Sequence, residues 1–250
     1  FTSRELQLPR LHIMNDIAIL RHARGQWGRW VALVTLMAMH AAAGAAELPV
    51  KQGLLLWLDA STQAAERQRA ALPPLLPGQG ADLLLDASDQ RARFVQPLAE
   101  RRPVLMKDGG AAFLRFDGKD DFLFLDRIKG LTPELTLFVL AAPKANPGGY
   151  SALFASSTSG GNDYTHGLNV DFGYLGTERL SHVSVESAGA AGGKDLLVEN
   201  LLGPAERPFG GFHLFTIRSK MGKDGMEFFL DGLKSGSRDR LESQIGLDRM

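Results

Sequence analysis

The chain has 250 residues, a formal net charge of zero and no cysteine. The neutral balance argues against a nucleic-acid-binding protein, which usually carries a basic excess, and a chain without cysteine has no disulfide, Cys-ligated zinc or thiol nucleophile. Because 44% of the residues are apolar, the chain can bury the core of one large or two small domains, and its 28 glycines and 12 prolines favour turns over long helices.

The first 46 residues are typical of a secretory signal of bacterial type. Several arginines precede an apolar run over residues 30–39, and small residues continue from there to Ala46. A basic region, an apolar region and a small-residue cleavage site are the parts of a signal peptide. The alternative is a membrane anchor, which needs about 20 apolar residues where this run has about 10–16. We therefore expect residues 1–46 to be an extension with a cleaved signal helix. What remains is then an exported protein (periplasmic, cell-surface or secreted) with no membrane span.

After the signal, short apolar segments alternate with turn residues. Residues 54–58 are the first expected strand, and residues 61–72 predict a short surface helix. Residues 73–112 are rich in proline, glycine and charge, so we expect long loops there. Residues 113–116 and 122–125 flank an Asp-Gly turn and predict a hairpin.

The second half of the chain reads as a series of strands. Residues 135–141 are nearly continuously apolar, as expected for a strand in the middle of a sandwich, and residues 151–155 follow as another. Strict alternation of apolar and polar residues, or short apolar runs, predict further strands near residues 168–172, 183–186, 196–198, 215–218 and 227–230. No βαβ alternation is present, so the expected fold is all-β: a two-sheet antiparallel β-sandwich, or jelly roll, over residues 47–250.

Five motifs occur in an order that is characteristic of one superfamily. They are GLLLWLDAS at 53–61, LRFDGKDDFL at 114–123, LTLFVL at 135–140, FHLFTI at 212–217 and FFLDG at 228–232. Through these motifs the chain resembles the concanavalin A-like lectin/glucanase superfamily, in its laminin-G-like branch, over about residues 53–250. The resemblance implies a jelly roll with further strands after the last motif, so we expect the sequence to be incomplete at its C-terminus.

The residues of a hydrolase are not recognisable. Glycoside hydrolysis needs two carboxylates flanking the scissile bond, and the glucanases that the chain resembles carry them on one strand as Glu-x-Asp-x-(x)-Glu. Here Asp171 and Glu186 each stand alone on an expected strand. The sequence also lacks Gly-x-Ser-x-Gly, His-Glu-x-x-His and a complete phosphate loop. No catalytic residue is predicted, and the sequence leans away from an enzyme.

The densest acidic cluster is Asp117, Asp120 and Asp121. Carboxylates and turn carbonyls suit calcium, although the spacing is not that of an EF-hand. The alternative, which the sequence favours, is that Asp and Gly only build a tight turn. Calcium is the one cofactor that the sequence offers.

The loop over residues 156–167 contains Asn162, Asp163, Tyr164 and His166 between two expected strands. An aromatic ring stacks on the apolar face of a sugar, while amide and carboxylate groups bind its hydroxyls. These four residues are therefore the candidate ligand-binding set. The alternative, which carries more weight, is an ordinary polar loop.

Three functions stay open from the sequence. The first is a non-catalytic recognition module that binds a glycan or a cell-surface protein through its loops. The second is a carbohydrate-active hydrolase whose acids lie on different strands or beyond residue 250. The third is a structural spacer in a larger exported protein, with no ligand at all.

Overall fold

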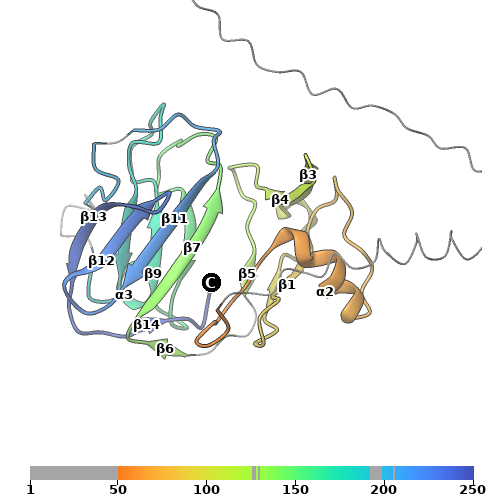
Figure 1. Ribbon diagram of the computed structural model, residues 1–250, viewed down its shortest axis with the longest axis horizontal. Helices are drawn as coiled ribbons and strands as arrows, with labels where there is room; N and C mark the ends of the chain where they lie inside the picture. Colours follow the sequence, from red (N-terminus) through yellow and green to blue (C-terminus); the bar gives the residue numbers. More distant parts are fainter. Residues whose placement is uncertain (1–49, 126–127, 129, 192–198, 205) are drawn as a thin grey trace, which may run out of the picture. The chain divides into compact units, whose positions relative to one another are not determined.

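Antiparallel sheets dominate the computed structural model, and its helices are few and short (Figure 1). The structure describes residues 50–125, 128, 130–191, 199–204 and 206–250. The expected signal segment and the strand expected at residues 196–198 lie outside these residues. None of the described helices has the length and apolar character needed to span a lipid bilayer.

The largest sheet has four strands in the order β13-β12-β11-β7. These strands are β7 (Leu135–Ala141), β11 (His213–Ser219), β12 (Gly222–Leu230) and β13 (Leu233–Arg240), and all neighbours pair antiparallel. The alternation predicted for β11 is confirmed, because Phe215 and Ile217 are fully buried. The central position expected for residues 135–141 is wrong, since β7 is the end strand of this sheet and leaves Phe138 65% exposed. An apolar run identifies a strand but not its neighbours.

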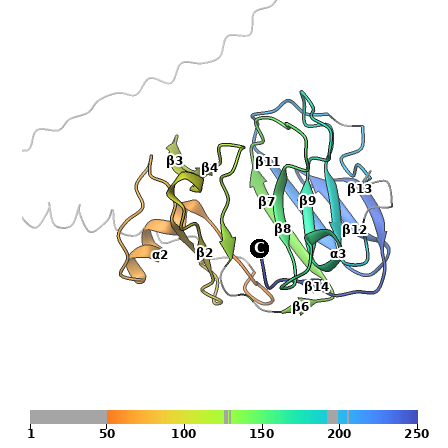
Figure 2. The same ribbon diagram turned by 180° about the vertical axis from the view of Figure 1, so that it is seen from behind.

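A three-stranded sheet lies across the same core. Its strands are β8 (Ala152–Ser156), β9 (Leu168–Asp171) and β10 (Ser184–Ser187), in the order β10-β9-β8. Leu168, Val170 and Val185 have no exposed surface and join the inward residues of the four-stranded sheet in one hydrophobic cluster. In Figure 2 the strands β8 and β9 lie in front of β11 and β12, and Figure 1 shows the reverse.

A second hydrophobic cluster lies among residues 56–125. Its elements are η1 (Ala60–Thr62), α2 (Gln63–Arg69), β1 (Leu83–Leu85), β2 (Arg93–Val95), η2 (Ala99–Arg101), β3 (Val104–Asp108), β4 (Ala111–Arg115) and β5 (Phe124–Leu125). The helix predicted at 61–72 is confirmed as η1 and α2, although Gln63, Glu66 and Arg67 on it are buried.

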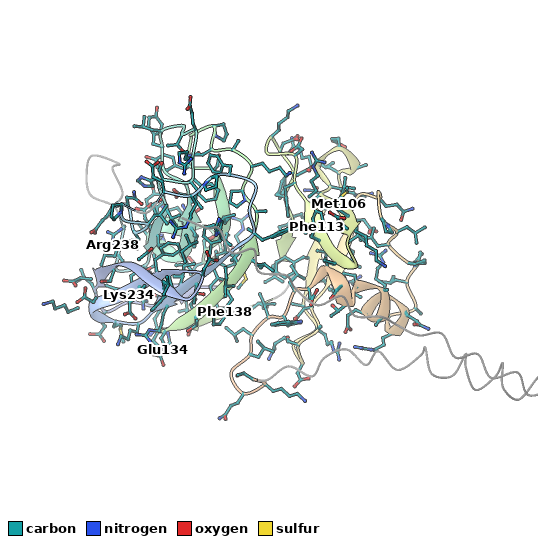
Figure 3. All side chains as sticks on the ribbon, turned by 45° about the horizontal axis from the view of Figure 1, so that its top comes forward. Met106, Phe113, Glu134, Phe138, Lys234 and Arg238 are labelled. Carbon is teal, nitrogen blue, oxygen red and sulfur yellow. The ribbon has the colours of Figure 1, made fainter. Side chains whose placement is uncertain are left out.

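Three predictions for this part of the chain are wrong. Residues 54–58 form no strand, and residues 73–112 contain β1, β2 and β3 rather than only loops. The predicted hairpin does not form either, because β4 pairs with β3 and β5 pairs with β2. Met106 and Phe113, labelled in Figure 3, are partners in the β3–β4 register.

The last residues of the chain, 245–250, contact both hydrophobic clusters. β14 (Ile245–Gly246) pairs with β6 (Leu131–Thr132). Beyond it, the carbonyl of Met250 accepts a hydrogen bond from the Leu125 N–H at 2.9 Å. Met250 and Ile128 pack against both hydrophobic clusters, so these residues connect the two cores.

Candidate functional site

The loop predicted to bind a ligand contains a single helical turn, α3 (Asp163–His166). Asn162 is its N-cap: the Oδ1 atom accepts hydrogen bonds from the Thr165 N–H at 3.0 Å and from the Thr165 hydroxyl. The Nδ1 atom of His166 lies 2.8 Å from that same hydroxyl. The Oδ1 atom of Asn162 and the Nδ1 atom of His166 are therefore engaged in contacts within the turn.

The loop is held firmly against strand β8. The Ser156 hydroxyl accepts a hydrogen bond from the Leu168 N–H at 3.1 Å, and a Cβ on Gly167 would collide with the Ser156 backbone. On the other side, Ser157 and Arg249 exchange two backbone hydrogen bonds of 2.9 and 3.1 Å. A scaffold of this kind keeps the side chains of the loop in fixed positions.

An open depression of about 350 Å³ lies beside α3. It is lined by Ala155, Ser156, Ser157, Asn162, Asp163, Arg249 and Met250. The structure thus brings Asn162 and Asp163 together, while Tyr164 and His166 are exposed on the same turn but do not line the depression. The residues that line it carry a carboxylate, a guanidinium, an amide and hydroxyls, and its volume is at the lower end of that of ligand pockets.

The depression includes a residue that sequence reasoning missed. Arg249 comes from the far end of the chain and reaches the site only because its backbone pairs with Ser157. No local pattern around Arg249 signals this long-range pairing.

The three acids proposed for calcium do lie together. Their carboxylate oxygens are within 4.8 Å of one another, so Asp117, Asp120 and Asp121 have the donor set for a hard cation. Turn chemistry already uses Asp117, whose Oδ1 accepts hydrogen bonds from the N–H groups of Lys119, Asp120 and Asp121. The bond from Lys119 is the main reason why the pKa of Asp117 lies below its usual value. Calcium binding stays a prediction.

A second group of polar side chains lies on strands β9 and β10. The period-two pattern places Asn169, Asp171, Ser184 and Glu186 on the face away from the core, where exposure is expected, yet all four are buried. Asp171 is only 1% exposed and accepts hydrogen bonds from the Gly173 N–H at 2.6 Å, the Asn169 amide at 3.0 Å and the Ser184 hydroxyl.

Strand pairing brings the two acids of this group near each other. Asp171 is opposite Ser184, and Glu186 is opposite Asn169, so the carboxylates are diagonal neighbours on one face. The backbones at diagonal positions are about 7–8 Å apart. The sequence shows each acid singly, and only the register reveals the pair.

No protein-family model, curated protein or solved structure matches the chain. The likeness to the lectin/glucanase superfamily therefore depends on the sequence motifs alone.

Proposed function

We propose that this chain is a non-catalytic recognition module of an exported protein, and that it binds carbohydrate in the depression beside α3. The observation that carries the proposal is the meeting of Asn162, Asp163 and Arg249 in one depression next to the exposed ring of Tyr164. The fold that supports it is proposed to be a concanavalin A-like, laminin-G-like sandwich. In favour of that fold, two antiparallel sheets share one hydrophobic cluster.

The chemistry of the depression fits sugar hydroxyls. A hydroxyl both donates and accepts, so it can bond to the Asp163 carboxylate as donor and to the Arg249 guanidinium as acceptor. The Asn162 side chain uses Oδ1 for the helix cap, which leaves its amide N–H groups to donate to a ligand. The Tyr164 side chain is 43% exposed, and its ring offers an apolar face beside these polar groups.

A glycan array probed with the 250-residue chain, with and without calcium, tests the proposal. We expect reproducible binding to at least one glycan class, lost in Asp163→Ala and weakened in Tyr164→Ala. Tyr174→Ala is the matched control, because this tyrosine is 61% exposed in the loop after the other end of β9. Binding that depends on calcium would also support the acidic cluster around Asp117.

Two results would contradict the proposal. A blank array from a folded sample would favour a protein-binding or spacer role. Binding lost in Tyr174→Ala but kept in Asp163→Ala would show that carbohydrate binds elsewhere on the chain.

A glycoside hydrolase is the second candidate, favoured by the diagonal placement of Asp171 and Glu186. An inverting enzyme needs its two carboxyl groups about 6.5–9.5 Å apart, a separation that two side chains at diagonal positions of one sheet face can reach. Its support is weaker because both acids are buried and three donors already hold Asp171. Turnover of an array-positive glycan that stops in Glu186→Gln would favour the hydrolase.

A further inference from the structure

Three arginines line a second depression, between α2 and the strand pair β1–β2. This depression has a volume of about 520 Å³. Its lining consists of Glu66, Arg69, Ala70 and Leu72 from α2 and the residues after it, and of Leu85, Asp86, Arg91 and Arg93 from β1, β2 and their connection. It shares no residue with the depression beside α3.

The walls of this depression are fixed by hydrogen bonds. Gln63 on α2 accepts a hydrogen bond from the Leu85 N–H at 2.8 Å and donates one to the Leu85 carbonyl at 2.9 Å, which ties the helix to β1. Arg67, one turn further along, donates to the carbonyls of Pro73 and Leu83. These bonds therefore fix the position of α2 relative to β1.

Both acids in the lining have their carboxylates occupied. Glu66 is buried, and its two oxygens accept hydrogen bonds from Arg69 at 2.6 and 2.7 Å and from Arg91 at 2.8 Å. Asp86 is also buried, and it accepts hydrogen bonds from the N–H groups of Trp57, Ser88 and Ala92 and from the Ser88 hydroxyl. Glu66 is thus paired with Arg69 and Arg91, whereas Asp86 keeps its negative charge because its four donors are uncharged. The lining therefore carries three arginine charges against two carboxylate charges.

Among the three arginines that line the depression, Arg93 is the one whose side chain has no partner among the described residues. The structure gives its guanidinium no hydrogen bond or ion pair with any described residue, although it lines the depression. Arg69 and Arg91 each use one nitrogen, Nη1, to bond Glu66, and their side chains are 55% exposed. An arginine has five N–H donors, so most of the donors in this depression are unused.

The backbone at Arg91 is held in an unusual conformation. Its φ is +52°, in the left-handed region that glycine adopts readily and a long side chain rarely does. This conformation closes the turn in which the Arg91 N–H donates to the Ser88 carbonyl at 3.3 Å. Strained positions of this kind are concentrated at functional sites.

We infer that this depression binds a small oxyanion, a phosphate or carboxylate group attached to an apolar body. The anion would lie against Arg93 and the free edges of Arg69 and Arg91, since guanidinium groups match the oxygens of both anions in bidentate geometry. The side chains of Ala70, Leu72 and Leu85 would contact the apolar part. This inference is independent of the proposed carbohydrate site.

Isothermal titration of the 250-residue chain with four probes tests the inference. The probes are inorganic phosphate, phenyl phosphate, benzoate and uncharged phenol. We expect phenyl phosphate to bind more tightly than inorganic phosphate, phenol to show no binding, and binding to weaken as salt is added. The comparison of phenyl phosphate with benzoate decides which oxyanion the site prefers.

The variant Arg93→Gln should weaken the binding of phenyl phosphate about tenfold or more, because one charge-assisted contact is lost. It should unfold at the same temperature as the parent chain, since the Arg93 side chain bonds to no described residue. Arg115→Gln is the matched control, an exposed arginine at the end of β4 and outside the depression. The inference is overturned if neither anion binds, if Arg93→Gln binds phenyl phosphate as tightly as the parent, or if Arg115→Gln weakens binding equally.

Discussion

At the scale of single residues, Arg240 ties several separate segments together. It lies on β13, is 1% exposed, and donates to the carbonyls of Ala188 at 2.9 Å, Pro133 at 2.5 Å and Ser243 at 3.1 Å. Burial lowers the pKa of its guanidinium. A buried cation that bonds to carbonyls from three places fixes their positions relative to β13.

Replacing Arg240 by methionine should destabilise the fold strongly. The change removes all the hydrogen bonds that this buried guanidinium donates, to the carbonyls of Ala188, Pro133 and Ser243 and to the Ser243 hydroxyl, so we expect the free energy of unfolding to fall by about 2–4 kcal/mol. Urea denaturation measures this directly. Arg115→Met, at an exposed position, serves as the control and should shift the value by less than about 0.5 kcal/mol. If the two changes lowered the free energy of unfolding equally, the buried contacts of Arg240 would not stabilise the fold.

His182 makes stability depend on pH. Its Nε2 atom is buried without a hydrogen-bond partner among the described residues, and burial lowers its pKa below 6.5 while the charge of Asp171 opposes this. The unfolded chain therefore takes up a proton at a pH where the folded chain does not. Stability should fall as the pH decreases from about 7 through 6.5 towards the lowered pKa of the folded state.

Denaturation curves of the parent chain and of His182→Gln, recorded between about pH 7 and pH 5, test this linkage. We expect the parent to lose more free energy of unfolding than the variant over this interval. Parallel curves would mean that other groups carry the pH dependence.

At the scale of elements, Glu227 joins three strands on the outer face of the four-stranded sheet. Its carboxylate on β12 accepts hydrogen bonds from Arg218 on β11 at 2.6 Å and from Lys234 on β13 at 2.9 Å. The bond from Lys234, followed by that from Arg218, lowers the pKa of Glu227 against the effect of burial. Because that pKa is lowered, the stabilisation is present above the ordinary value and is lost as the pH falls through the pKa of the folded state.

We expect Glu227→Gln to cost about 1 kcal/mol of unfolding free energy near neutral pH, where the carboxylate is charged. The difference from the parent should shrink towards about pH 3, because the parent then loses its charge as well. Urea titrations at the two pH values measure it. A cost that does not change with pH would assign the effect to packing rather than to charge.

The strand pairings show what the sequence could and could not predict. Period-two alternation correctly identified the inward residues of β11, because burial of one face is a local property of the chain. The prediction that residues 113–116 pair with residues 122–125 was wrong, because β4 pairs with β3. Gly109 and Gly110, both with positive φ, form the two-residue turn that joins these two strands. Two such glycines are a strong hairpin signal, but the surrounding charged and proline-rich residues favoured a loop.

The candidate site was predictable to a similar extent. Asn162 and Asp163 are adjacent in sequence, so their joint position in the depression follows from local structure. Arg249 joins them, and Asp171 comes near Glu186, only through pairing between distant strands or segments. A single sequence carries no signal for such pairings beyond the hydrophobic pattern.

At the scale of the whole molecule, the two depressions are built from different parts of the chain and share no lining residue. The one beside α3 is built on the three-stranded sheet, whereas the arginine depression is built on α2, β1 and β2. Variants in one should leave ligand binding at the other unchanged. The proposed carbohydrate binding and the proposed anion binding can therefore be tested separately on one chain.

The most direct test of the central claim is an NMR titration of the isotope-labelled chain with the glycan that binds best on the array. The account predicts that amide shifts concentrate on residues 156–167 and on Arg249, and that they disappear in Asp163→Ala. Shifts confined to Tyr174 and its neighbours or to the arginine depression, or no shifts with any glycan, would contradict a carbohydrate site beside α3.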